Sequence, residues 1–303
     1  MGKINFKKLF ELFKCSLFDF LDDNAMKFSA ALSYYTIFAL PPLLILIIAG
    51  GSFFFEEGDI STFFYQQLSD FVGPNTTVEV QKAMGNVQLS RSGILPTVIG
   101  VGMLLFSASG VFAEIQSSIN YIWGIVAKPD QSMKRLVKNR LLSFAMIASV
   151  GFVLLVSLMI NSIVGILYGY LSTFFAEETI YLVVVVNNIV VFLVITCLFM
   201  LIFKTLPNGI IGWKEAFVGS AFTAILFMIG KFGIGIYLGT TASSSLYGAA
   251  GSIIVMFIWV YYSAMILYFG AEFTKNYAAM YGKKIVPGAY SLQIRKNVIH
   301  HED

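Results

Sequence analysis

The chain contains six long runs of mostly apolar residues, and each run is long enough to cross a lipid bilayer as one helix. A spanning helix needs about 20 such residues, because the hydrocarbon core is about 30 Å thick and each residue adds about 1.5 Å. We therefore expect an all-α fold, a polytopic transmembrane bundle of about six helices. In chain order, the expected spans are 28–53, 94–123, 141–171, 180–203, 216–239 and 249–272.

The composition supports the same class of protein. Hydrophobic residues make up 57% of the 303 residues, charged residues make up 12%, and the mean hydropathy is +0.79. Soluble domains carry about 25% charged residues. A water-soluble fold of this size has no means of covering so much apolar surface.

The basic residues predict how the helices are oriented. Seventeen of the 20 Lys and Arg residues lie in four segments that fall on one side of a six-helix layout. Because basic loops stay in the cytoplasm, we expect both termini inside, with Trp123 and Trp213 at the inner membrane interface. The expected organisation is a cytoplasmic segment at 1–27, a transmembrane domain at 28–280 with an outer loop at 54–92, and a cytoplasmic tail at 281–303.

Three local features are expected to shape the helices. The pair Pro41–Pro42 should kink the first span, because proline removes backbone hydrogen bonds. The pair Gly235–Gly239 has the spacing that lets two membrane helices approach closely. The outer loop carries apolar residues at helical spacing, which predicts an amphipathic helix on the outer membrane surface; these residues are Phe64, Leu68, Phe71 and Val72.

Ionisable groups at membrane depth are the best candidates for functional residues, since each is costly to insert. Glu114, Lys231 and Glu272 are such groups. Two interpretations stay open: they form a structural Glu–Lys pair or reach the headgroups, or they line a pathway for a substrate or ion. Glu114 shares a helix face with small and polar residues, so we expect it to point into the bundle. The amides Asn161, Asn187 and Asn188 are expected to hydrogen-bond between helices.

Motifs of soluble enzymes are missing from the sequence. There is no phosphate-binding loop, no nucleophile elbow and no zinc-protease helix, and the two histidines are His300 and His301 at the end of the chain. A metal-dependent nuclease needs several converging His, Asp or Glu ligands. Cys15 and Cys197 give no disulfide framework. We expect no enzyme activity, no catalytic residues, no metal, no cofactor and no nucleic-acid partner.

Several stretches resemble the YihY/BrkB family of bacterial inner-membrane proteins. The most specific is YGAAGSIIVMFIWVYYSAMILYFGAEFTKNYA at 247–278, and the others are AALSYYTIFALPPLL at 30–44, FSASGVFAEIQSSINYIWGI at 106–125 and LPNGIIGWKEAFVGSAFTAILFMIGKFGIGIYL at 206–238. The resemblance implies a six-helix protein of the inner membrane. Family members once carried a ribonuclease label, and the missing metal ligands argue against that activity here. The doubled proline departs from the single proline that is usual in the family.

These features together favour a transport function. We expect the protein to move a lipid, another amphiphile or a small solute across the cytoplasmic membrane and to support the cell envelope. A gradient or a partner must drive this step, because the sequence has no nucleotide-binding motif. The alternative is a membrane scaffold for envelope assembly that transports nothing. Expected partners are membrane lipids, together with envelope-assembly proteins or further copies of the chain.

Overall fold

A computed structural model describes residues 6–51, 94–128, 178–241 and 250–294, together with eight positions between 65 and 82. The third expected span and the four residues of the predicted outer amphipathic helix lie outside the described residues. The described part is mostly helical, and the expectation of an all-α membrane protein is confirmed. Its helices are α1 (Phe6–Asp22), α2 (Ala25–Gly51), α5 (Ile94–Ile122), α7 (Glu178–Thr205), α8 (Trp213–Thr241) and α9 (Ala250–Tyr281).

Five of the expected spans coincide with helices, namely α2, α5, α7, α8 and α9. Within the described residues, three segments are long and apolar enough to cross a membrane: Val185–Thr205, Trp213–Ile234 and Ile254–Tyr281. The helices α2 and α5 have 27 and 29 residues, which also exceeds the length that a bilayer requires. The helix α2 runs through Pro41–Pro42 without a break in its assignment, and the kink stays a prediction.

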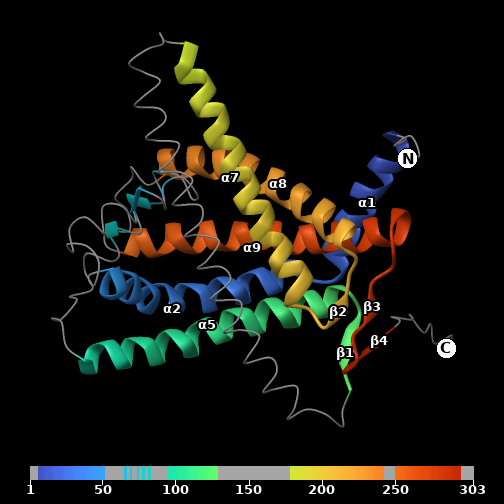
Figure 1. Ribbon diagram of the computed structural model, residues 1–303, viewed down its shortest axis with the longest axis horizontal. Coiled ribbons are helices and arrows are strands. Elements are labelled where there is room, and N and C mark those ends of the chain that lie inside the picture. The colour runs from blue at the N-terminus through green and yellow to red at the C-terminus, as the bar shows by residue number, and fades with distance from the viewer. Residues whose placement is uncertain are drawn as a thin grey trace.

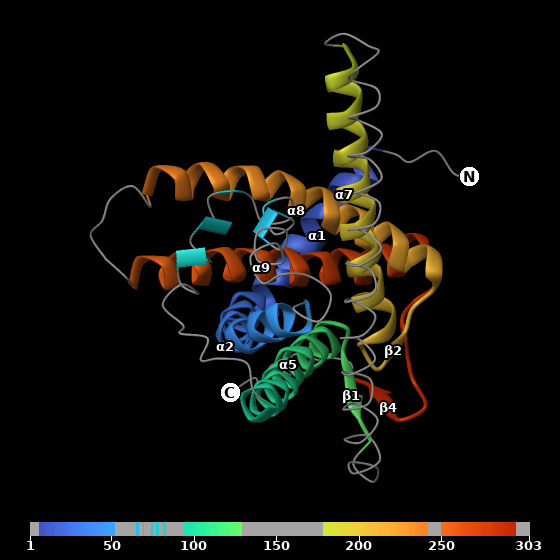
Figure 2. The same cartoon turned by 60° about the vertical axis from the view of Figure 1, so that its left-hand side comes forward.

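The helix α9 lies at the centre of the bundle (Figure 1). It packs against α2 and α5 on one side and against α8 on the other, and α7 crosses α8 obliquely (Figure 2). The helix α1 contacts both α2 and α9. It crosses α9 near the C-terminal end of that helix, so α9 touches elements from both halves of the chain.

The contact between α8 and α9 depends on a reciprocal exchange of glycine and threonine. Gly219 of α8 lies against Thr274 of α9, and Gly270 of α9 lies against Thr223 of α8. A Cβ atom on either glycine would overlap the facing threonine side chain. Each threonine hydroxyl donates to the carbonyl four residues earlier in its own helix, at 2.7 Å for Thr223 and 2.6 Å for Thr274. Small residues at this spacing allow close packing of membrane helices.

Gly230 of α8 makes a further close contact, with Tyr262 of α9. The sequence predicted the close approach at Gly235–Gly239, whose packing lies outside the described part of α8. The α8 glycines that contact α9, Gly219 and Gly230, therefore lie nearer the start of α8 than the predicted pair.

Two pairs of short antiparallel strands close one end of the bundle. The strand β1 (Ile125–Ala127) pairs with β4 (Ser291–Gln293), and β2 (Gly209–Ile210) pairs with β3 (Val286–Pro287). Gly124 turns the chain from α5 into β1 with a φ of 66°, which glycine adopts without strain. The sequence predicted only a tail beyond residue 280, and the structure folds its first part back onto the helix ends.

Side-chain hydrogen bonds tie the same helix ends together. The Gln116 side chain donates to the Leu206 carbonyl at 2.6 Å, and Asn120 accepts from the Asn208 amide at 2.8 Å. Lys128 donates to the Ala289 carbonyl at 2.9 Å. The described parts of the four basic segments therefore lie at one end of the bundle. This arrangement agrees with the prediction that all four segments lie on the same side of the membrane. Their cytoplasmic location stays a prediction.

The two tryptophans at this end have different surroundings. Trp123 is only 3% exposed, and its indole nitrogen donates to the Ala271 carbonyl at 3.1 Å. Trp123 therefore contacts protein and not solvent or lipid, and its depth at the membrane interface stays a prediction. Trp213 is 67% exposed, with the Lys204 ammonium 5.0 Å from its ring centroid, which fits an interfacial residue.

Candidate functional site

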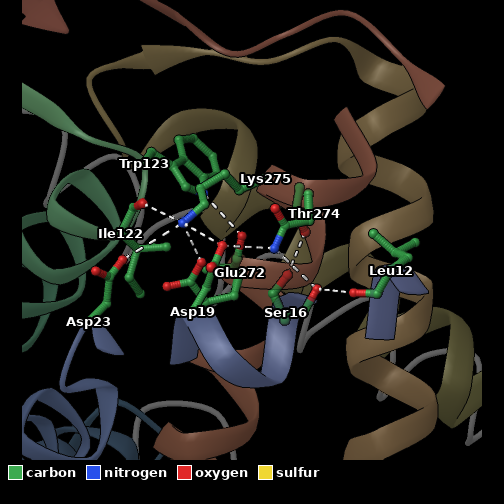
Figure 3. A network of polar contacts seen from close by, with 12 residues as sticks. Leu12, Ser16, Asp19, Asp23, Ile122, Trp123, Glu272, Thr274 and Lys275 are labelled. Carbon is green, nitrogen blue, oxygen red and sulfur yellow. Dashed lines mark hydrogen bonds and ion pairs between the residues drawn. The ribbon is translucent and has the colours of Figure 1, made fainter. Parts of the chain in front are cut away.

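Lys275 of α9 is surrounded by oxygen atoms from three helices and one turn (Figure 3). Its ammonium nitrogen lies 2.6 Å from a Glu272 carboxylate oxygen, 3.2 Å from Asp19 and 3.7 Å from Asp23. It also donates to the Ile122 carbonyl at 3.2 Å. We call Asp19, Asp23, Glu272 and Lys275 the Lys275 cluster.

The local sequence explains why these groups meet. Asp19 lies in the last turn of α1, and Asp23 lies in the turn that joins α1 to α2. Asn24 allows this tight turn because it adopts a φ of 56°, a conformation that asparagine tolerates better than most residues. Ile122 ends α5, where the last carbonyls have no donor in their own helix and attract a cation.

Asn276 makes a second connection between α9 and α1. Its side-chain nitrogen donates to Asp19 at 3.0 Å and approaches the Ser16 hydroxyl at 3.4 Å. Ser16 in turn donates to the Leu12 carbonyl at 2.8 Å. Two consecutive side chains of α9 therefore hold the last turns of α1 (Figure 3).

The exposure of the four charged side chains falls from one edge of the cluster to the other. Asp19 is 38% exposed, Lys275 is 27%, Asp23 is 11% and Glu272 is 0%. Beyond the ion pair with Lys275, neither Glu272 oxygen accepts a hydrogen bond within the described residues. Three carboxyl groups share one ammonium, so the fully ionised cluster has an excess of negative charge. Such an excess is costly away from water unless a proton, a cation or solvent compensates it.

Polar groups continue from the cluster along the contact between α5 and α9. Tyr268, one turn before Glu272, is fully buried, and its hydroxyl makes no regular hydrogen bond among the described residues. That hydroxyl lies beside Ser118 of α5 and within electrostatic reach of Glu114. Ser118 donates to the half-buried Glu114 at 3.2 Å. We call Glu114, Ser118, Tyr268 and Glu272 the polar track.

The structure brings two of the sequence-predicted site residues into this arrangement. Glu114 and Glu272 both belong to the polar track. Lys231 is half-buried on α8, and α8 and α5 pack on opposite sides of α9 (Figure 2). The packing of these helices gives no support to a structural pair of Glu114 with Lys231.

Two of the predicted amides, Asn187 and Asn188, lie apart from the track. Asn187 is half-buried and Asn188 is exposed on α7, a helix that packs on α8. Asn161 lies outside the described residues. The interhelical role expected for these three side chains stays a prediction.

Sequence reasoning missed Lys275, Asp19 and Asp23. The expected sixth span ended at residue 272, so Lys275 was counted only as a basic residue beyond the span, whereas α9 continues to Tyr281. At about 1.5 Å per residue, its 32 residues reach about 48 Å and extend well beyond the hydrocarbon core. The spacing of Glu272 and Lys275, which places oppositely charged groups on one helix face, was the available signal.

The chain matches the model of a protein family described as virulence factor BrkB over residues 17–289. The chain belongs to the virulence factor BrkB family. The match includes all four residues of the Lys275 cluster and both helices of the polar track. The resemblance seen in the sequence is therefore confirmed.

Relatives of this BrkB-family protein are described as UPF0761 membrane proteins. The one from Stenotrophomonas maltophilia (strain K279a) is 27% identical over 269 residues, which cover 86% of this chain and 59% of the relative. The one from Saccharophagus degradans is 26% identical over 280 residues, covering 86% of this chain and 58% of the relative. The chain thus spans about three fifths of the length of these relatives. No solved structure matches it.

The descriptions of these relatives name a membrane protein and no activity. Within the described residues, no group of three or more His, Cys, Asp or Glu side chains is arranged to hold a metal ion.

Proposed function

We propose that this BrkB-family protein is a multi-pass protein of the bacterial cytoplasmic membrane that carries a lipid, another amphiphile or a small solute across it and so supports the cell envelope. The observation that carries the proposal is the polar track, a row of buried and half-buried polar groups between α5 and α9. One end of the track is the Lys275 cluster. There Asp19 is exposed to solvent, and the exposure of the other charged side chains decreases towards the fully buried Glu272.

The energetic argument concerns why such groups are present in a membrane bundle. A charged side chain at the centre of a bilayer costs roughly 2.5–3.5 kcal/mol on insertion scales, and ionisable groups in spans usually line a pathway or pair inside the bundle. A buried ion pair often adds little stability compared with apolar residues of the same volume. Full burial of Glu272, which shares its counter-ion with two other carboxyl groups, and of the Tyr268 hydroxyl adds a further cost. A transport role explains why these residues occur here.

The composition of the cluster fits a site that exchanges a cation during transport. Three carboxyl groups face one ammonium, and Asp19 leads from the exposed edge towards the buried Glu272. A proton or cation that enters there neutralises the excess charge and loosens the pull of Glu272 on Lys275. The ion pair between Asp19 and Lys275 holds α1 against α9. Neutralising the cluster would therefore weaken the contact between α1 and α9. A gradient of that cation is our proposed driving force.

A vesicle assay distinguishes a transporter from a scaffold. The full chain is reconstituted in phospholipid vesicles with a fluorescent phospholipid, and the fraction that an external reductant bleaches reports movement between leaflets. Uptake of small labelled solutes is followed in parallel vesicles. We expect one of the two cargo classes to move faster than in protein-free vesicles, and Glu114→Gln and Tyr268→Phe to slow that movement at least several-fold.

The matched control is Glu11→Gln, because Glu11 is exposed on α1 and belongs to neither the cluster nor the track. It should leave transport unchanged. Complementation of an envelope-sensitive strain, with the amount of protein in the membrane measured alongside, tests the same variants in cells. Full complementation by both track variants at normal abundance would overturn the proposal and favour the scaffold.

A further inference from the structure

The helix α1 presents three different faces, and only one of them is covered by the bundle. The covered face holds Leu12, Ser16 and Phe20, which are at most 6% exposed. At about 100° per residue, the neighbouring face holds Phe10, Phe13, Leu17 and Leu21. These four side chains are 63%, 41%, 42% and 50% exposed. We call them the α1 apolar face.

Contacts with α9 show in which direction the α1 apolar face points. Ser16 and Asp19 contact Asn276 and Lys275, whereas the Phe13 and Phe20 rings lie 5.5 Å and 5.8 Å from the ring of Phe269. Phe269 precedes Lys275 by six residues, so it lies about 9 Å further from the end of α9, towards the middle of the bundle. Around α1, Phe13 and Phe20 lie between Ser16 and the rest of the apolar face. The apolar face therefore turns towards the membrane interior.

The third face of α1 is mainly polar and lies on the far side of the helix from the covered face; Phe18, which is 54% exposed, lies within it. It carries exposed side chains of both signs, among them Lys7, Glu11, Lys14 and Asp22, and the exposed Cys15. The Lys14 ammonium lies 5.8 Å from the ring centroid of Phe18. A lysine whose stem follows an aromatic ring while its charge reaches water or phosphate is typical of the membrane interface.

We propose that α1 lies in the membrane–water interface at the basic end of the bundle, with the α1 apolar face among the lipid chains and its lysines at the headgroups. Two observations favour lipid over another protein as the occupant. The apolar face is continuous, through Phe269, with the apolar sides of the spanning helices. The charged side chains of α1 lie outside the sector that the four apolar side chains occupy, with Lys14 at its border. The proposal does not depend on transport, since it concerns only where α1 lies.

Site-specific fluorescence on the full chain tests this placement in vesicles of phosphatidylcholine and phosphatidylglycerol. An environment-sensitive nitrobenzoxadiazole label is attached to Leu17→Cys in a Cys15→Ser, Cys197→Ser background. The native Cys15, in a Cys197→Ser background, is the matched control two residues away on the polar face. The label at 17 should emit at shorter wavelength, be quenched by nitroxide-labelled lipid and be protected from aqueous iodide. The label at 15 should show the reverse.

Two results would overturn the proposal. One is equal quenching of both labels by iodide, which means that α1 lies in water. The other is a label at 17 that is protected from iodide but not quenched by lipid nitroxide, which means that a protein surface or a second copy covers the apolar face. Phe10→Cys in the same background repeats the measurement at a second position of the α1 apolar face, about two turns before Leu17. Gel filtration of each labelled protein verifies that it keeps the fold.

Discussion

The helix α9 makes two contacts of opposite character, with α8 and with the elements around the Lys275 cluster. Along α8 the helices fit by shape, with Gly219 and Gly270 each receiving a threonine whose hydroxyl is satisfied in its own helix. Around the cluster, charge holds α1 to α9, and Glu272 keeps oxygens without hydrogen bonds among the described residues. The first contact is what stability alone would select, whereas the second carries an energetic cost that the proposed transport function would explain.

The largest effect is expected from removing the only cation of the cluster. Lys275→Met leaves Asp19, Asp23 and Glu272 facing one another without a counter-charge. Breaking a buried pair in this way costs about 3–5 kcal/mol of folding stability. Thermal unfolding in detergent, compared with the exposed Lys8→Met as control, measures the difference. A Lys275→Met protein that unfolds like the control would show that the cluster is neither buried nor paired.

The glycine–threonine contact between α8 and α9 should lose stability when a single methyl group is added. Gly219→Ala places a Cβ against Thr274 and should destabilise the protein by about 1–3 kcal/mol, as overpacking does. Gly233→Ala, in the same helix with open space around it, should be neutral or slightly stabilising because alanine favours helix. The two unfolding midpoints, measured side by side, decide the point. Equal midpoints would mean that α8 and α9 are further apart than the structure has them.

A smaller effect is expected at the strand-capped end. Trp123→Phe removes the hydrogen bond to the Ala271 carbonyl and should cost about 1 kcal/mol, the typical value of one such bond. Trp213→Phe, at an exposed indole, should change stability by less than about 0.5 kcal/mol. Denaturant unfolding followed by circular dichroism compares the pair. A greater loss at Trp213 would contradict the burial assigned to Trp123.

The sequence was sufficient to predict five of the described long helices, because bilayer thickness sets a length and a composition that few other folds share. It also singled out Glu114 and Glu272, since ionisable groups are rare at membrane depth. It could not predict the partners of Glu272. The bond between Asn276 and Asp19 joins residues 257 positions apart, and hydropathy carries no information about such contacts.

The errors have equally physical causes. The polar residues Lys275 and Asn276 marked the end of the sixth expected span, whereas the helix α9 continues to Tyr281. The burial of Trp123 could not be predicted from residue type, because no hydropathy scan detects the short strand pairs at this end of the bundle. The covered face of α1 and the α1 apolar face can be told apart only when the position of α9 is known.

The most direct test of the account compares two buried glutamates. Glu272→Gln removes charge from the cluster at constant shape, whereas Glu215→Gln weakens a structural bond from the Lys283 amide at 3.0 Å. We predict that Glu272→Gln unfolds at or above the wild-type temperature but loses transport and envelope complementation. We predict that Glu215→Gln unfolds at a lower temperature but keeps its activity per molecule. Full activity of Glu272→Gln at normal abundance, or a loss no greater than its loss of folded protein, would contradict the claim that the cluster serves function.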